Sequence, residues 1–144
     1  MLWLRKSKKG FTLIELMVVV AIIGVLALLG LRIYTGQQDK AKNALIKANV
    51  GTIQTLIQAE LADEIAADVW IAVCNNTVGD NLINKSGIIN PINGEIQTDN
   101  PASVVAANAG EVWVTIDVDE VFDINGANAD DSGNVYGTNL TARK

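Results

Sequence analysis

The chain has 144 residues with a formal net charge of −5, one cysteine and no histidine. Its length suits one small domain with a single core. A single cysteine excludes an intramolecular disulfide, and the lack of histidine removes catalytic triads of the Ser-His-Asp kind and the commonest metal ligand.

The first ten residues form a basic leader that ends at Gly10. Four basic residues give this segment a charge of +4: Arg5, Lys6, Lys8 and Lys9. The positive-inside bias predicts that the leader stays in the cytoplasm and that the rest of the chain faces outward. A secretory signal has its cleavage site after the apolar region, whereas Gly10 precedes it. A cut after Gly10 would therefore leave the apolar region on the product.

An apolar run of membrane length follows the leader. Between Phe11 and Leu31 the only charged residue is Glu15, and 21 residues are enough to cross a bilayer as a helix. A carboxylate inside such a span costs at least a few kcal/mol. We therefore expect the Glu15 carboxylate to bind a partner group and to have a functional role.

The start of the apolar run carries a specific motif. The basic leader is followed by the string GFTLIEL, from Gly10 to Leu16, and then by further apolar residues. This combination resembles the class III signal of bacterial type IV pilins, the prepilin-type N-terminal methylation motif, which the related pseudopilins of type II secretion systems share. The resemblance covers roughly the first 50 residues.

The resemblance implies that a prepilin peptidase cuts after Gly10 and that Phe11 becomes an N-methylated N-terminus. It implies a homo-oligomer, a helical filament with the apolar helices at its centre. A pilus assembly platform and an external ATPase motor would build this filament. The precursor would reside in the inner membrane, and the assembled chain in an extracellular pilus for adhesion, motility or DNA uptake. We expect a structural subunit and no enzyme, although the chain would be a substrate of the peptidase and of an N-methyltransferase.

In this interpretation the cut gives Glu15 a counter-ion. The free amine of Phe11 lies at i−4 from Glu15 on a helix, so the two groups can pair within one subunit. The resemblance implies the other pairing, with the Phe11 amine of a neighbouring subunit. Such a pair in low dielectric sets register more surely than it adds net stability.

Two other functions stay open. A pseudopilin of a type II secretion system would carry the same signal. A membrane-anchored extracytoplasmic enzyme or binding protein would share the basic flank and the apolar run, but would leave Glu15 without a reason. Removal of the leader leaves seven Lys and Arg against sixteen Asp and Glu, which disfavours general nucleic-acid binding.

The helix is predicted to continue to about residue 67, because no proline occurs before Pro91. Apolar residues recur mostly at spacings of three and four, which predicts an amphipathic stripe that packs on a globular domain. The stripe consists of Ala41, Ala44, Leu45, Ala48, Ile53, Leu56, Ile57, Leu61 and Ile65.

One position inside the helix departs from the family. Type IV pilins usually carry a proline eight residues after the position of Gly24, and this chain has Arg32 there. Gly24 and Gly30 each weaken the helix by roughly 1 kcal/mol relative to alanine. The sequence leaves open whether this stretch unwinds in a filament. Arg32 also marks the outer end of the membrane span, where its stem can reach the interface.

Short β-like runs and Asn/Gly-rich turns fill the rest of the chain. We predict a helix end or a first strand at residues 69–73, a short helix near 80–85 and a turn at 90–94. Residues 103–107 and 111–118 flank a predicted hairpin turn, and a third strand uses 121–124 or 135–138. In the second of these runs, the alternation from Val112 to Val118 predicts one face against the helix.

These elements predict an α+β fold, in which a long N-terminal helix with a protruding apolar half packs on a small antiparallel sheet. Its parts are a cleaved leader at residues 1–10, a transmembrane and filament-core helix at 11–31, and an amphipathic helix half with a β headpiece at 32–144.

Two smaller features concern ligands and redox chemistry. Hard oxygen donors crowd one loop and predict either a calcium site or a hydrated acidic loop; no other cofactor is expected. The candidate ligands are Asp117, Asp119, Asp123, Asn125, Asp130 and Asp131. They lack the full EF-hand spacing. Many pilins close their C-terminal region with a disulfide, and here Cys74 is predicted to be a buried free thiol, with an intermolecular bridge as the alternative.

Overall fold

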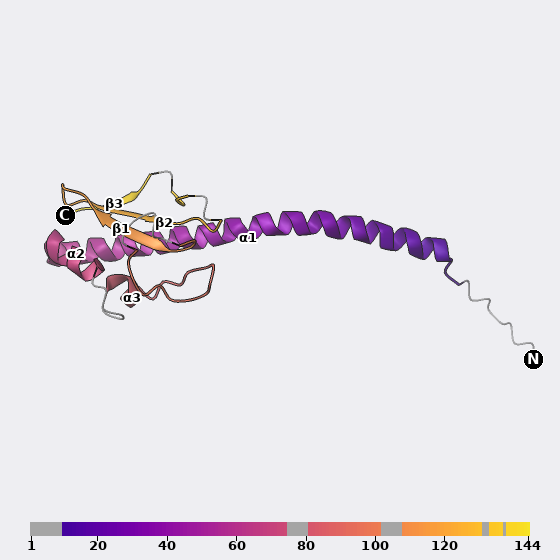
Figure 1. Ribbon diagram of the computed structural model, residues 1–144, viewed down its shortest axis with the longest axis horizontal. Helices are drawn as coiled ribbons and strands as arrows, with labels where there is room; N and C mark the ends of the chain where they lie inside the picture. Colours follow the sequence, from indigo (N-terminus) through magenta and orange to yellow (C-terminus); the bar gives the residue numbers. More distant parts are fainter. Residues whose placement is uncertain (1–9, 75–80, 102–107, 131–132, 137) are drawn as a thin grey trace, which may run out of the picture. The chain divides into compact units, whose positions relative to one another are not determined.

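The computed structural model describes residues 10–74, 81–101, 108–130, 133–136 and 138–144 (Figure 1). Its contacts divide the chain into two compact units, Met1–Gln37 and Gln38–Lys144. The elements are α1 (Leu13–Asp63), α2 (Ala66–Cys74), α3 (Leu82–Ser86), β1 (Val112–Ile116), β2 (Phe122–Gly126) and β3 (Leu140–Ala142). The combination of a long N-terminal helix with a small antiparallel sheet confirms the α+β prediction.

Helix α1 ends four residues earlier than predicted. It stops at Asp63, and the chain starts a second helix, α2, at Ala66. The sequence has no proline or glycine at this break. Burial gives the reason, because the change of direction places Val69 and Val73 of α2 in the core, where they are 1% and 0% exposed. Residues 69–73, for which a helix end or a strand was predicted, are therefore helical.

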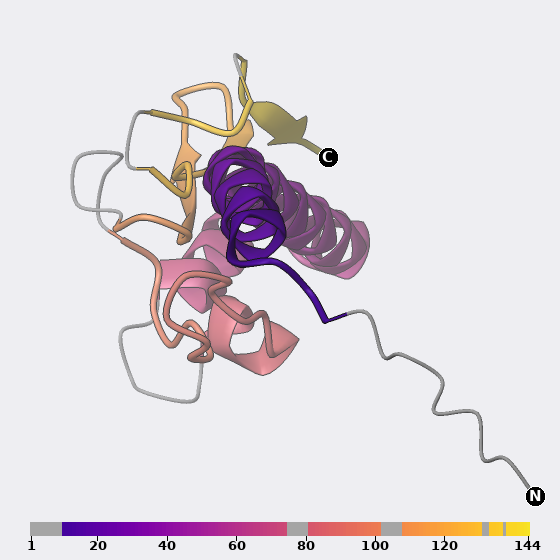
Figure 2. The same cartoon turned by 90° about the vertical axis from the view of Figure 1, so that its right-hand side faces the viewer.

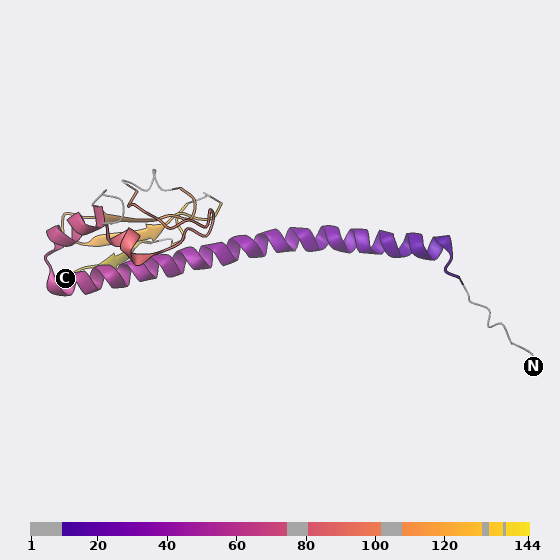
Figure 3. The same cartoon turned by 90° about the horizontal axis from the view of Figure 1, so that it is seen from below.

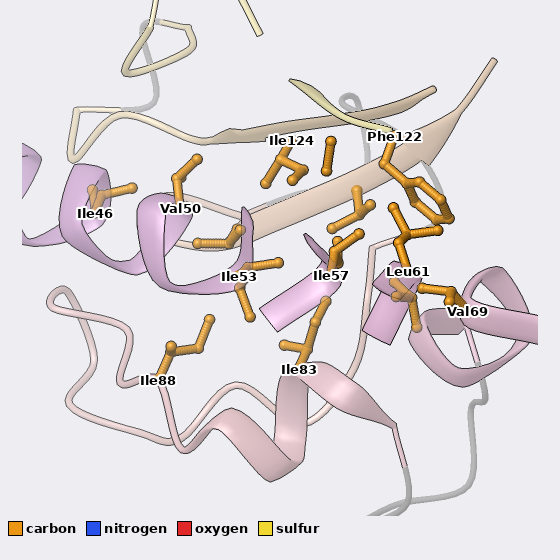
Figure 4. Close-up of a cluster of buried hydrophobic side chains, with 14 of the residues drawn as sticks. Ile46, Val50, Ile53, Ile57, Leu61, Val69, Ile83, Ile88, Phe122 and Ile124 are labelled. Atoms are coloured by element: carbon orange, nitrogen blue, oxygen red, sulfur yellow. The ribbon is translucent and has the colours of Figure 1, made fainter. Parts of the chain in front are cut away.

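The core of the unit Gln38–Lys144 lies between α1, α2, α3 and the sheet, as Figure 4 shows in close-up. Side chains of α1 at a spacing of three and four residues enter it, and all are almost fully buried: Ile46, Val50, Ile53, Ile57 and Leu61. Phe122 of β2 meets Trp70 of α2, with ring centroids 6.3 Å apart. Buried apolar area of this kind contributes about 25 cal/mol per Å² to folding.

The predicted stripe on α1 is right from Ile53 to Leu61 and wrong at both ends. Ala41, Ala44, Leu45, Ala48 and Ile65 are exposed. In Figure 3 the sheet, α2 and α3 lie along one side of α1 in this unit, so the opposite side of the helix is uncovered. Four of these residues belong to the exposed surface of α1 and Ile65 to the break after it, because apolar spacing along a helix does not by itself indicate which face is buried.

The sheet is antiparallel with the strand order β1-β2-β3. Val114 of β1 pairs with Ile124 of β2, which in turn pairs with Leu140 of β3. Strand β1 pairs with β2, and the predicted hairpin partner of β1, residues 103–107, lies outside the described residues. Of the two candidates for the third strand, 121–124 is confirmed as part of β2, whereas the described part of 135–138 forms no strand.

Strand β1 is buried on both faces rather than one. Val112 and Val114 face the core as predicted, yet Trp113 between them is only 2% exposed. The indole Nε1 of Trp113 is buried without a hydrogen-bond partner among the described residues. Val118 is 93% exposed, because β1 ends at Ile116 and the chain turns before it.

The local predictions between the helix and the sheet are confirmed. Helix α3 is capped at its start by Asn81, whose side chain accepts a hydrogen bond from the Asn84 N–H, and at its end by Gly87, which has the left-handed conformation with φ 66°. The turn at 90–94 forms, and it ends at Gly94 with φ 76°. Figures 1 and 2 both show the sheet above and α3 below the second half of α1, so the two flank the side of the helix that is covered in Figure 3.

The contact between β2 and α1 predicts a large effect of a small substitution. We expect Gly126→Ala to destabilise the fold by about 1–3 kcal/mol, because the new Cβ would lie 2.5 Å from Cγ2 of Ile46. The control is Gly51→Ala, whose Cβ would meet nothing within 4 Å. It should stabilise α1 by up to about 1 kcal/mol. Thermal unfolding of the full chain in detergent micelles measures both, and equal midpoints would contradict this packing.

Candidate assembly site at the start of α1

The first turn of α1 is closed by a reciprocal pair of side chains. Thr12 stands just before the helix, and its hydroxyl accepts a hydrogen bond from the Glu15 N–H at 3.3 Å. In return, the Glu15 carboxylate accepts bonds from the Thr12 N–H at 2.9 Å and from the Thr12 hydroxyl at 2.7 Å. This is a capping box, in which two otherwise unpaired donors at a helix start are satisfied.

The capping box uses only half of the Glu15 carboxylate. Both bonds from Thr12 end on Oε2. Among the described residues, Oε1 takes no part in the capping box. A negative group in the first turn is also favoured by the helix dipole.

Phe11 lies outside the helix, which changes the predicted geometry of its pair with Glu15. Helix α1 begins at Leu13, so Phe11 and Glu15 are not four residues apart on one helical face. In the uncut chain the nitrogen of Phe11 is also part of the peptide bond to Gly10. The Phe11 side chain is 84% exposed. Pairing of a free Phe11 amine with Glu15 stays a prediction.

The following turns present a continuous apolar surface. Among the described residues, α1 alone has the length and hydropathy to cross a membrane. Its most apolar window of 18 residues has a mean hydropathy of 2.8, and none of it is buried in the chain. Large side chains such as Leu13, Leu28 and Leu31 are 67–78% exposed. Such a surface requires lipid or other protein around it.

The predicted weak points lie within an unbroken helix. Gly24, Gly30 and Arg32 all belong to α1, and a Cβ at either glycine would meet nothing within 4 Å. The carbonyl of Arg32 accepts a hydrogen bond from the Thr35 hydroxyl at 3.1 Å. Unwinding of this stretch in a filament stays a prediction.

The structure spreads the predicted calcium ligands over several elements. Asp117 and Asp119 lie in the exposed turn after β1, and the Asp117 carboxylate accepts the Val118 N–H at 2.6 Å. Asp123 lies on β2 opposite Thr115. Asp130 is exposed after β2, and Asp131 lies outside the described residues. Within the described part of the chain, no three His, Cys, Asp or Glu residues form a group that could hold a metal ion.

Asn125, the remaining candidate ligand, is instead the centre of a buried hydrogen-bond network. It is 0% exposed. Its Nδ2 donates to the Tyr136 carbonyl at 3.2 Å and to Asn139 Oδ1 at 2.9 Å, while its Oδ1 accepts the Tyr136 N–H at 3.3 Å. The amide therefore holds the C-terminal segment to β2.

Further polar contacts connect the C-terminal segment to α1. Asn43 Oδ1 accepts the Ala129 N–H at 2.8 Å, and Gln54 Nε2 donates to the Thr141 carbonyl at 2.8 Å. The Lys47 ammonium lies 5.4 Å from the centre of the Tyr136 ring. These contacts close the region without a disulfide. Cys74 ends α2, and the predictions for its side chain fall outside the described residues.

Sequence reasoning missed Thr12 and assigned Asn125 a different role. The Thr-x-x-Glu spacing of the capping box is visible in the sequence and could have indicated Thr12. Nothing local distinguishes an asparagine that binds calcium from one that bridges two chain segments. The network around Asn125 depends on partners 11 and 14 residues away.

The chain is similar to one family model and to several known proteins. A family model described as the prokaryotic N-terminal methylation motif matches residues 5–31. The chain is 44% identical over 56 residues to fimbrial protein EcpB of Eikenella corrodens, across 39% of this chain and 35% of EcpB. It is 28% identical over 135 residues to a type IV major fimbrial protein FimA of Dichelobacter nodosus, across 94% of this chain and 73% of FimA.

A secretion protein is also similar to this chain. Type II secretion system core protein G of Pseudomonas aeruginosa is 37% identical over 62 residues, across 43% of this chain and 44% of that protein. The chain spans 35%, 41% and 59% of the length of three fimbrial relatives. No solved structure matches the chain significantly. The chain thus carries the prokaryotic N-terminal methylation motif and is a relative of bacterial type IV fimbrial proteins.

Proposed function

We propose that this chain is a structural subunit of a type IV pilus, which polymerises through the apolar part of α1 into an extracellular filament. The observation that carries the proposal is an apolar helical segment of membrane length that the chain leaves uncovered. In the first turn of this helix, Glu15 has one carboxylate oxygen, Oε1, outside the capping box. Adhesion, motility and DNA uptake are the functions such a filament would serve.

Assembly follows from the placement of this surface. A repeated contact between different surfaces of identical subunits does not close on itself and grows into a fibre when rotation is combined with a rise. Before assembly, the apolar helix would be embedded in the inner membrane. Helix contacts would replace lipid contacts when a subunit enters the fibre, so the net cost of the exchange is modest.

Processing would prepare the Glu15 site. A prepilin peptidase would cut after Gly10, and methylation would follow on the new amine of Phe11. That cation would then find Oε1 of Glu15 on a neighbouring subunit, while Thr12 retains Oε2. An assembly platform and an external ATPase would supply recruitment and energy.

A pseudopilin of a type II secretion system is the second candidate. The similarity to core protein G of such a system favours it, and a pseudopilin would carry the same N-terminal methylation motif. The subunit would then form a short periplasmic assembly instead of an external pilus.

Electron microscopy of filaments sheared from cells, with mass spectrometry of their subunit, tests the proposal. We expect long external fibres whose subunit starts at methylated Phe11. A Gly10→Leu variant is the control and should accumulate uncut in the membrane. Fibres absent from the surface, together with loss of protein secretion on deletion, would support the pseudopilin instead. An uncut chain in the wild type would contradict both functions.

A further inference from the structure

Among the described residues, a side-chain amide and not a further strand covers the outer edge of β1. Gln97 is 6% exposed and lies beside Val112. Its Nε2 donates to the Val112 carbonyl at 2.6 Å, and its Oε1 accepts the Val112 N–H at 2.8 Å. A primary amide presents one donor and one acceptor side by side, so it can replace the peptide group of a neighbouring strand.

A second amide repeats this arrangement two residues further along the strand. Asn100 Nδ2 donates to the Val114 carbonyl at 2.9 Å, and Asn100 Oδ1 accepts the Val114 N–H at 2.9 Å. Val112 and Val114 are the positions whose backbone groups face away from β2. Together Gln97 and Asn100, named here the edge clasp, satisfy four outward-facing backbone groups.

The backbone that carries the edge clasp is itself anchored. The Gln97 N–H donates to the Ile88 carbonyl at 3.0 Å, and Gln97 Nε2 also contacts the Asp99 carbonyl at 2.9 Å. Ile89 and Ile96 form an isolated antiparallel bridge just before it. The backbone around Gln97 is therefore held in place by contacts that do not involve β1.

The two edges of the sheet differ in their need for such cover. β3 has three residues and is followed by Arg143 and Lys144. Short strands and charges are both features that discourage pairing with another chain. β1 has the sequence VWVTI, which is uncharged and rich in β-branched and aromatic residues. Segments of this kind pair readily with copies of themselves when their edge is open.

We propose that the edge clasp prevents β1 of one copy from pairing edge to edge with β1 of a second copy. The partner that it excludes is the same strand of an identical chain, which presents the same sequence and the same row of backbone groups. Copies of the chain can then associate only through other surfaces. Even where many copies lie close together, the edge clasp keeps their sheets from pairing. The inference needs no particular type of filament.

A pair of variants separates this role from simple stabilisation. Gln97→Met/Asn100→Leu removes all the clasp hydrogen bonds and leaves an apolar edge. Gln97→Met/Asn100→Lys loses the same bonds but places a positive charge on the edge, which opposes pairing without restoring the clasp. Gln58→Met, an exposed amide on α1, is the control for loss of an amide elsewhere. The single variants Asn100→Leu and Asn100→Lys repeat the comparison with only half of the bonds removed.

The full chain in detergent micelles is the sample, and the readouts are the melting temperature, the dispersed fraction after centrifugation and amide exchange. We expect about tenfold faster exchange at Val112 and Val114 in both double variants. The leucine forms should sediment as β-rich aggregates. The lysine forms should melt at a temperature similar to that of the leucine forms but stay dispersed, as Gln58→Met should. Equal sedimentation of the leucine and lysine forms, or unchanged exchange at Val112 and Val114, would overturn the proposal.

Discussion

Glu15→Gln should abolish filament assembly while leaving the start of α1 intact. Glutamine is as good as glutamate at the third helical position of a capping box, so the bond from the Thr12 N–H should persist. What glutamine lacks is the charge. If Oε1 binds the Phe11 amine of a neighbouring subunit, a neutral amide there leaves a cation without a counter-ion at membrane depth. We therefore expect surface filaments to fall by at least about tenfold, as for a lost buried ion pair.

The measurement is the yield of sheared filaments relative to the membrane-bound subunit. Cleavage after Gly10 and membrane insertion should be unchanged in Glu15→Gln, because neither depends on the charge of that residue. Thr12→Ala is the matched control: it removes the cap, at a cost of about 1 kcal/mol to the helix end, and keeps the carboxylate. Normal pili from Glu15→Gln, with defective pili from Thr12→Ala, would show that Glu15 acts only as a cap.

Asn125→Leu should release the C-terminal segment from the sheet. Leucine has the same number and branching of heavy atoms, although its two methyl groups are bulkier than the amide, and the N–H and carbonyl of Tyr136 and the side chain of Asn139 lose their partner. A buried polar group without a partner costs about 1–3 kcal/mol. We expect a total loss of roughly 2–4 kcal/mol, a large part of the stability of a small domain.

Thermal unfolding and limited proteolysis of the full chain in micelles measure this loss. Cleavage should move to the segment after β2 in Asn125→Leu at temperatures where the wild type is resistant. Gln58→Leu, which replaces an exposed amide on α1, should stay within about 0.5 kcal/mol of the wild type. An unchanged melting temperature in Asn125→Leu would mean that the network contributes nothing to holding the segment.

The features that the sequence predicts well depend on neighbouring residues. The α3 helix and the turn at 90–94 are encoded by Asn, Gly and Pro chemistry within a few positions. Glu15 is predicted to be a functional residue because a charge within an apolar run is energetically unfavourable and is retained only where it serves a function. Such arguments need no knowledge of the fold.

The features that it predicts poorly depend on distant partners. Strand β3 has three residues, and its pairing with β2 joins positions about 18 residues apart. Ala44 and Ala48 carry a helical apolar pattern, but only the position of the sheet shows that this face of α1 is uncovered. The sequence around Gln97 and Asn100 indicates only a loop, and their role is visible only from their hydrogen bonds to β1 in the structure. Asn125 is a further case, since its partners belong to the segment after the strand.

The closure of the C-terminal segment by Asn125, Asn43 and Gln54 also determines how the head recovers from damage. A bridge between two cysteines, once reduced, needs an oxidant before it can form again. Amide hydrogen bonds re-form whenever the segment returns to its place, without enzyme or electron acceptor. This closure of the unit Gln38–Lys144 therefore does not depend on the redox state of its surroundings and is the same in a reducing and in an oxidising environment.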